Sequence, residues 1–112
     1  MVQVNWVKST GGDYLDLHRV DLSNVAAFGV YVIWKNGQPG PVVRVGQGII
    51  KDRLILHRQD SKILAHRPLL VTWAVVSASQ SDGVERFLAD HYKPLVGDAF
   101  PDVFPIQVNL VA

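Results

Sequence analysis

The stretch from residue 29 to residue 57 reads GVYVIWKNGQPGPVVRVGQGIIKDRLILH, and it contains the turn and the change of periodicity that decide the fold. Residues 27–34 are rich in β-branched and aromatic side chains, which is typical of a strand. Asn36-Gly37 and Pro39-Gly40 favour a turn, and a second strand is expected over residues 42–45. About five residues cannot form a parallel crossover, so the sequence predicts an antiparallel hairpin.

A helix is expected directly after this hairpin. Ile50, Leu54 and Ile55 share one helical face, and Pro68 marks the last residue at which the helix could end. The sequence around residues 59–61, Gln-Asp-Ser, predicts an interruption. His66 and Arg67, just before the proline, are typical of cations at the end of a helix.

The second half of the chain predicts one more strand and one more helix. Residues 69–76 are almost continuously apolar, as in a central strand buried on both faces. Ser81-Asp82 is expected to cap a helix, and Pro94 and Gly97 limit its end. The apolar positions expected on this helix are Val84, Phe87, Leu88, Tyr92 and Leu95.

The two ends of the chain are less regular. Residues 1–26 predict at most one short strand, and residues 106–110 predict either an edge strand or an extended cover. The order strand, strand, helix, strand, helix indicates an α+β protein with a sheet of three or more strands that begins with an antiparallel hairpin and is flanked by helices. With 112 residues, of which 48% are hydrophobic, we expect a single domain over residues 1–112, with an N-terminal extension (1–26) and a core of about 27–112.

Composition excludes some classes of site. The chain has no cysteine, so disulfides and thiolate metal sites are excluded, and a metal would need oxygen or nitrogen ligands. The net charge of +1 does not indicate a nucleic-acid-binding protein, although residues 49–67 carry five Lys or Arg against two Asp.

No signal sequence and no apolar run of about 18 residues is found, so we expect a soluble cytoplasmic protein with no membrane partner.

Several residues of the hairpin are candidates for chemistry. Alternation along the first strand places Gly29, Tyr31 and Ile33 on one face. Tyr31 is either an ordinary strand aromatic or a functional hydroxyl. Arg44 interrupts a strand of valines, so it should lie on the open face, beside a groove or in solvent.

The junction between the second strand and the first helix offers two interpretations. Gly46 and Gly48 flank Gln47, and such glycines either serve the backbone conformation alone or allow close approach of an anion. Arg53 and His57 are four residues apart and project from one side of the helix, where they either meet a phosphate or are simply solvated.

Two further polar residues stand beside apolar ones in the second half. Glu85 follows the core position Val84, so it lies at the border of the buried face and could point into a cleft. Magnesium often takes only one or two carboxylates and completes its coordination with water and phosphate. Asn109 lies in a short apolar segment and needs hydrogen-bond partners if it is buried.

Taken in order, these residues resemble the GIY-YIG nuclease superfamily. Gly29-Val30-Tyr31 is similar to the first motif, and Arg44-Val45-Gly46 is similar to the second, with Arg44 where the family usually has tyrosine. Residues 50–58, which contain Arg53, His57 and Arg58, resemble the helix of the family that carries an arginine and often a histidine. Gly83-Val84-Glu85 resembles the metal-ligand helix, and Val108-Asn109 the late asparagine.

The resemblance implies an endonuclease that hydrolyses phosphodiester bonds of DNA with Mg²⁺ or Mn²⁺. Glu85 would hold the metal, Arg53 would bind the phosphate oxygens, and Tyr31, helped by His57, would position or deprotonate the attacking water. An unperturbed tyrosine has a pKa of about 10, so nearby cations would have to lower the pKa of Tyr31 for it to act as a base by itself. The substrate-binding residues implied are Arg44, Gly46, Gln47, Arg58 and Asn109.

The alternative is a GIY-YIG-like module with an impaired site that binds nucleic acid or a protein partner, an interpretation favoured by Arg44 and the small net charge. The sequence leaves open whether the nucleic acid is DNA or RNA. A small nuclease cuts both strands of DNA either in two successive binding events or as a homodimer, and the sequence favours neither.

Overall fold

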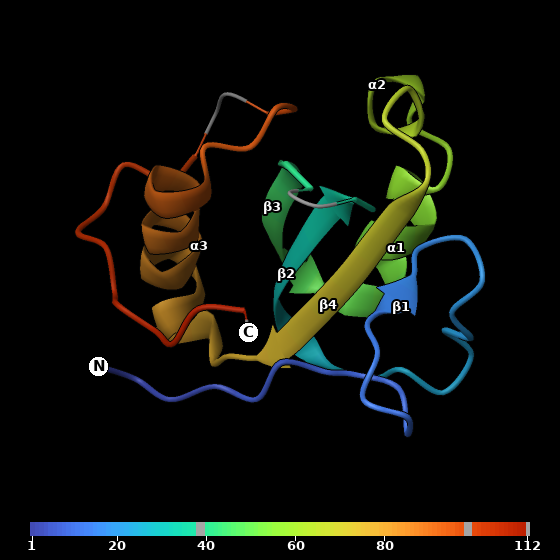
Figure 1. Cartoon of the computed structure of the whole chain (residues 1–112). Coiled ribbons are helices and arrows are strands. Elements are labelled where there is room, and N and C mark those ends of the chain that lie inside the picture. Colours follow the sequence, from blue (N-terminus) through green and yellow to red (C-terminus); the bar gives the residue numbers. More distant parts are fainter. Residues whose placement is uncertain (38–39, 98–99, 112) are drawn as a thin grey trace.

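The core of the molecule is a four-stranded antiparallel sheet. The computed structural model describes residues 1–37, 40–97 and 100–111. In the sheet, β2 (Phe28–Lys35) pairs with β3 (Val42–Ile49) on one side and with β4 (Leu69–Val75) on the other, and the short β1 (Leu15–Asp16) pairs with β4. The spatial order is β1-β4-β2-β3, so β3 lies at an edge (Figure 1). With its helices this is the predicted α+β architecture.

The hairpin of β2 and β3 is confirmed, but β3 is longer than the sequence predicts. It continues through the Gly-Gln-Gly junction, where Gly46 lies opposite Tyr31 and Gly48 opposite Gly29. Glycine weakens a strand by itself, so the sequence suggested an end at Val45, but continuous pairing with β2 overrides that preference. Part of the predicted turn, Pro39, lies outside the described residues.

Two helices follow the hairpin, separated where the sequence predicts an interruption. Helix α1 spans Ile50–His57, and the short α2 spans Ser61–Leu64. Asp60 separates them, because its carboxylate caps α2 by accepting a hydrogen bond from the backbone N–H of Lys62 at 2.9 Å.

The last helix, α3 (Ala78–Tyr92), begins earlier than predicted. Its N-cap position is Ser77, so the prediction of a cap at Ser81-Asp82 was wrong. Ser81 is buried, and its hydroxyl donates back to the carbonyl of Ala78. The helix ends where expected, just before Pro94, and the predicted apolar position Leu95 therefore lies beyond it and is 56% exposed.

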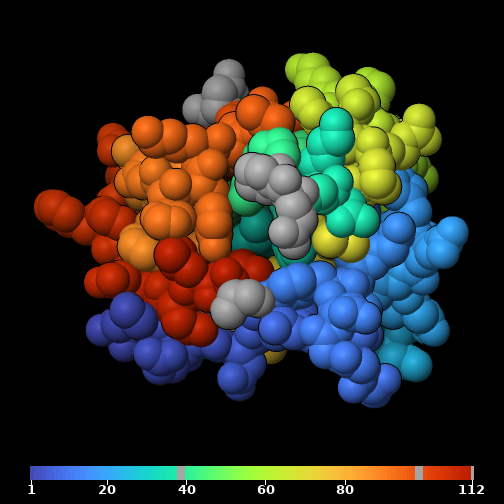
Figure 2. Space-filling model, in the orientation of Figure 1, coloured from blue at the N-terminus to red at the C-terminus, as the bar shows by residue number. Residues whose placement is uncertain are grey.

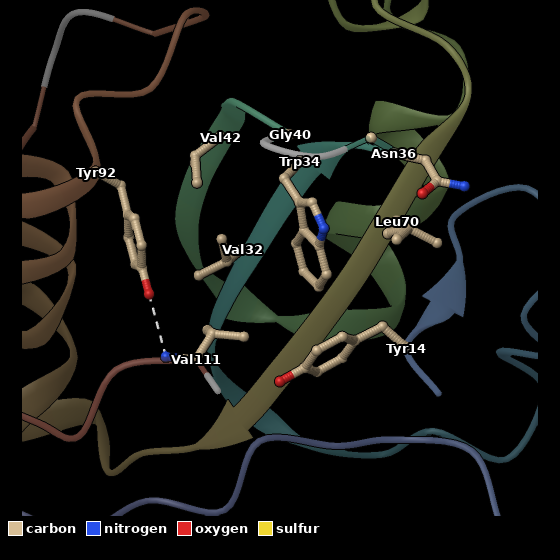
Figure 3. Close-up of a pocket in the computed structure, with 10 residues that line it drawn as sticks. Tyr14, Val32, Trp34, Asn36, Gly40, Val42, Leu70, Tyr92 and Val111 are labelled. Carbon is tan, nitrogen blue, oxygen red and sulfur yellow. Dashed lines mark hydrogen bonds between the residues drawn. The ribbon is translucent and has the colours of Figure 1, made fainter. Parts of the chain in front are cut away.

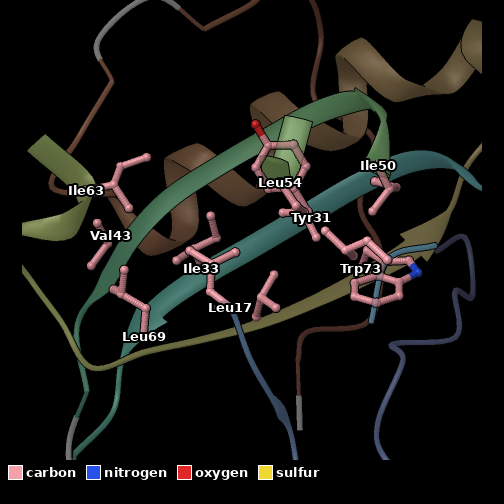
Figure 4. Packing of buried hydrophobic residues seen from close by; sticks show 11 residues of the cluster. Leu17, Tyr31, Ile33, Val43, Ile50, Leu54, Ile63, Leu69 and Trp73 are labelled. Atoms are coloured by element: carbon pink, nitrogen blue, oxygen red, sulfur yellow. The ribbon is translucent and has the colours of Figure 1, made fainter. Parts of the chain in front are cut away.

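Helices cover both faces of the sheet, with α1 and α2 on one face and α3 on the other (Figure 1). The predicted alternation of β2 is confirmed. Tyr31 and Ile33 pack in one cluster with Leu54 of α1 (Figure 4), whereas Val30 and Val32 pack in a second cluster with residues of α3. Because β3 is an edge strand, side chains from α1 and α3 can meet around it.

The N-terminal segment packs on the sheet and against the C-terminal one. Leu17 and Leu22 are buried in the cluster beneath α1, and the backbone N–H of Val7 donates to the carbonyl of Trp73. Val2 forms an isolated parallel bridge with Val108, so the tail is an extended cover and not a strand of the sheet. Figure 2 shows the N-terminal segment, in dark blue, beside the C-terminal segment, in red, on the surface. No helix within the described ranges is long and apolar enough to cross a membrane.

Candidate active site

A pocket of about 410 Å³ opens at the β3 edge and combines residues from four elements. Strand β2 contributes Tyr31, β3 contributes Arg44 and the Gly-Gln-Gly junction, α1 contributes Arg53 and His57, and α3 contributes Glu85. The lining residues are Phe28, Tyr31, Arg44, Gly46, Gln47, Gly48, Arg53, His57 and Glu85. The structure therefore brings together all four residues that the sequence placed in a catalytic role, together with three of the five predicted to bind substrate.

In the lining of the pocket the Tyr31 hydroxyl lies 2.6 Å from Nε2 of His57, within hydrogen-bond distance. Burial raises the pKa of Tyr31, and the nearby positive charge of Arg44 offsets only part of that effect. Burial also lowers the pKa of His57 to about 4, with Arg44 contributing in the same direction. At neutral pH Tyr31 is thus a phenol and His57 a neutral imidazole, so the hydroxyl can donate its proton to His57.

The close approach of Tyr31 depends on the glycines of β3. A Cβ atom at position 46 would lie 2.1 Å from the Tyr31 hydroxyl oxygen, so only glycine lets the ring lean across the edge strand (Figure 4). At position 48 a Cβ would lie 2.9 Å from Nε of Arg53, and the backbone there has a φ of +130°, which favours glycine. Both glycines therefore have a conformational role, because each leaves room for a side chain that lines the pocket.

Glu85 reaches the pocket from the buried border of α3 and is only 8% exposed. The Gln47 amide donates to the Asp82 carboxylate at 2.5 Å and to Oε2 of Glu85 at 3.3 Å, which connects β3 to α3. Burial raises the pKa of Glu85, although the hydrogen bond from Gln47 and the charge of Arg44 act against this. A cation bound beside Glu85 would favour its carboxylate form.

Two arginines supply positive charge. Arg44 is half-buried, and its Nε is fully buried without a hydrogen-bond partner. Arg53 is exposed at the pocket wall. A guanidinium matches the geometry of phosphate oxygens, so this wall is suited to an anionic ligand.

Arg58 and Asn109, the other two predicted substrate-binding residues, lie outside the pocket. The guanidinium of Arg58 donates to the backbone carbonyls of Leu17 at 2.7 Å and Val20 at 2.5 Å. The Asn109 amide accepts from the Val4 N–H at 2.7 Å and donates to the Val4 carbonyl at 2.9 Å. Both side chains hold the N-terminal segment in place, so neither belongs to the candidate site.

Replacing Asn109 tests this structural role. In Asn109→Ala the polar backbone groups of Val4 lose both partners, which we expect to lower the free energy of unfolding by about 1–3 kcal/mol. The pocket is untouched, so ligand binding in it should keep its affinity under conditions where the variant is folded. Urea denaturation and binding measured on the same preparation check this, and weakened binding with unchanged stability would return Asn109 to the site.

The low pKa of His57 predicts acid sensitivity. The folded-state pKa of about 4 lies below the ordinary value of 6.5, so the unfolded chain takes up this proton more readily. The contribution of neutral His57 to stability is therefore complete above pH 6.5 and is lost as the pH falls towards 4.

We expect wild type to lose more stability than His57→Gln between about pH 7.5 and pH 5, measured by urea unfolding. Comparing the two proteins cancels the opposite trend from Glu85, whose raised pKa favours the folded state in acid. Parallel losses in both proteins would mean that His57 is not held neutral.

The donor set is compatible with a divalent cation that keeps most of its water. No cluster of three or more His, Asp or Glu that could hold a metal is found among the residues the structure describes. Magnesium does not need one, since one or two carboxylates with water and phosphate suffice. Glu85 lines the pocket, and Asp82, three residues earlier on α3, shares its Gln47 partner.

A different pocket, of about 420 Å³, lies at the opposite end of β2 (Figure 3). Trp34 and Tyr92 stand on two sides of it, and Val32 and Val42 line it between them. The Tyr92 hydroxyl accepts a hydrogen bond from the Val111 N–H. The described residues that line it include neither an acidic nor a basic side chain, so it is less suited to acid–base chemistry than the pocket at the β3 edge.

Sequence reasoning missed Asp82 and Phe28. The sequence suggests a capping or surface role for Asp82, but this residue lies one helical turn before Glu85, and that spacing could have signalled a second carboxylate near the site. Phe28 lines the pocket and is 37% exposed. An exposed aromatic at the start of a strand carries no clear signal in a single sequence.

Comparison of the chain with protein-family models, with curated proteins and with solved structures found no match.

Proposed function

We propose that this protein is a divalent-metal-dependent endonuclease that hydrolyses phosphodiester bonds of DNA in the pocket at the β3 edge. The observation that carries the proposal is the hydrogen-bonded pair of Tyr31 and His57, 2.6 Å apart, in one pocket with Arg53 and the buried Glu85. A proton acceptor, a phosphate-binding cation and a carboxylate that can hold a metal are the parts that such a hydrolysis needs. The proposal also agrees with the resemblance of the sequence to GIY-YIG nucleases.

Tyr31 and His57 would act together on the attacking water. The raised pKa of Tyr31 makes a free phenolate scarce at neutral pH, so the phenol passes its own proton to Nε2 of His57 as it takes one from the water. The water oxygen bonds to phosphorus while the bond from phosphorus to the leaving sugar oxygen breaks. The leaving oxygen takes a proton from solvent. In this relay Tyr31 ends as a phenol again and His57 is the net proton acceptor. Burial makes His57 a weak base, and the negative charge of a phosphate bound in the pocket would raise its low pKa and make it a better acceptor.

The arginines would bind the phosphate. Arg53, exposed at the pocket wall, can offer two parallel N–H donors to the nonbridging oxygens. Arg44 adds positive charge beside Tyr31 and, after burial, contributes to the low pKa of His57. Glu85, with Asp82 nearby, would hold Mg²⁺ or Mn²⁺, and such an ion when bound supplies charge stabilisation at the phosphate.

Nicking of supercoiled plasmid tests this function. Wild type should convert plasmid to the open-circular form with Mg²⁺ or Mn²⁺ and not with a chelator, and Glu85→Ala should lack this activity. An RNA substrate in parallel distinguishes the two nucleic acids. Equal nicking by the two proteins, or none by either across duplex, single-stranded and branched DNA, would refute the proposal.

A binding module without catalysis is the second candidate. It is favoured by the two hydrogen bonds from Gln47, which engage one oxygen of each of the Asp82 and Glu85 carboxylates, and by Arg44 at the usual tyrosine position. This candidate predicts DNA binding that weakens steeply with salt, without cleavage in any metal. The plasmid assay and a binding titration together separate the two functions.

A further inference from the structure

A second polar pocket, of about 610 Å³, lies beside the candidate active site, and Arg44 lines both. Asp60, Lys62 and His66 form one wall, from α2 and the chain on either side of it. Residues 95–97, after α3, form the other wall. This wall is fixed to the sheet edge, because the backbone N–H groups of Leu95 and Val96 donate to the carbonyls of Val42 and Val43 at 3.2 and 2.8 Å.

The Arg44 side chain lies between the two pockets, with its guanidinium packed against Gly97. It points from β3 to the face that carries Tyr31, and a Cβ atom added to Gly97 would lie within 1.9 Å of its terminal nitrogen. Its Nε is buried without a partner. A buried N–H without a partner costs free energy, so this position of Arg44 is not favoured by its own hydrogen bonding. A guanidinium has five N–H groups, and the others can donate to a ligand in either pocket.

The charges of this second pocket favour an anion. Arg44 and Lys62 are cations, His66 adds ring nitrogens, and Asp60 is the acid among the described residues that line the pocket. One oxygen of Asp60 already accepts the backbone N–H of Lys62 at the start of α2. For the Lys62 and His66 side chains, no hydrogen bond is found within the described part of the chain, so both are available to a ligand.

We propose that this pocket is a second phosphate subsite, which binds the phosphate adjacent to the scissile one in the same nucleic-acid strand. The inference rests on the proposed function and deepens it. Arg44 reaches both pockets, so it can lie between two successive phosphates, with Arg53 at the scissile one and Lys62 and His66 at its neighbour. The strand then crosses the β3 edge in one direction, from the catalytic pocket towards α2. Arginine at position 44, where the resemblance expects tyrosine, has a role in this arrangement.

Binding without metal tests the subsite independently of cleavage. The probe is a fluorescent single-stranded DNA of about 20 nucleotides, titrated with a chelator present between about 50 and 200 mM salt. The test variant is Lys62→Ala/His66→Ala. The matched control is Arg19→Ala, which removes one exposed cation outside all the pockets described.

We expect the double variant to bind several-fold more weakly at low salt. The slope of log affinity against log salt should become shallower by about 0.7 for each phosphate that the protein no longer neutralises. Arg19→Ala should keep the wild-type slope. Thermal denaturation checks that both variants are folded.

Two results would overturn the subsite. One is a double variant with the same slope as Arg19→Ala. The other is stabilisation of wild type, but not of the double variant, by inorganic phosphate with an unchanged DNA slope, since that would assign the pocket to a free phosphate. Metal-dependent nicking that is lost in Glu85→Ala would still support the nuclease in either case, so the two proposals can fail separately.

Discussion

Tyr31→Phe should lower the rate of plasmid nicking by about 10²- to 10⁴-fold, the usual contribution of a positioned acid–base group. The substitution removes the hydroxyl that lies 2.6 Å from His57 and leaves the ring, which is buried against Ile33 and Leu54. The fold should therefore be retained. The effect should fall on kcat, since the hydroxyl moves a proton and does not anchor the substrate.

Tyr92→Phe is the matched control for this loss. Tyr92 is a half-buried tyrosine outside the catalytic pocket, and its hydroxyl accepts the Val111 N–H. Its replacement should cost about 1 kcal/mol of stability and leave nicking unchanged. Nicking by Tyr31→Phe at the rate of Tyr92→Phe would remove Tyr31 from the chemistry, because both variants lose one hydroxyl.

Glu85→Gln should abolish most metal-dependent nicking, with a fall of about 10²- to 10³-fold, the equivalent of about 3–4 kcal/mol of transition-state stabilisation. The amide keeps the size of the carboxylate and an oxygen that can accept from Gln47. Because burial raises the pKa of Glu85, the charged form is disfavoured in the folded state, and a neutral side chain should not lower stability at neutral pH. Activity and stability should therefore change independently.

The control for Glu85→Gln is Asp82→Asn. Asp82 carries the same charge as Glu85, lies on the same helix and also accepts a hydrogen bond from Gln47. Asp82 is exposed, and we expect nicking to fall by less than about tenfold. The Glu85 carboxylate remains, and one carboxylate can suffice to bind magnesium. Equal losses in both variants would mean that the effect is one of overall charge. A destabilised Glu85→Gln protein would contradict the assigned direction of the Glu85 pKa.

The hairpin and the division of the first helix could be predicted because their signals are local. Turn residues, runs of β-branched residues and the capping residue Asp60 determine the structure of residues only a few positions away in the sequence. The length of β3 could not be predicted this way, because its glycines are held in the sheet by pairing with β2. The start of α3 was misplaced because this segment has three serines, at positions 77, 79 and 81, and each is a residue type that can cap a helix. Ser77 takes the N-cap position, whereas Ser81 is buried inside the helix.

The site could be predicted only in part, because sequence patterns report local structure and some of the site depends on tertiary packing. The spacing of residues within single strands and helices predicted that four side chains could face a cleft, and all four line the pocket: Tyr31, Arg53, His57 and Glu85. The roles of Arg58 and Asn109 depend on where residues 1–26 lie, and that segment has no periodic pattern. The buried Nε of Arg44 and the place of this residue in the lining of two pockets depend on the tertiary packing of residues 95–97 against β3.

A crystal soaked with Mn²⁺ and a short phosphorothioate oligonucleotide tests the central proposal most directly. We predict an anomalous peak beside the Glu85 carboxylate, and a phosphate group between that ion and Arg53, facing the Tyr31 hydroxyl. Metal and phosphate bound elsewhere, with the pocket at the β3 edge filled only by water, would contradict the proposal.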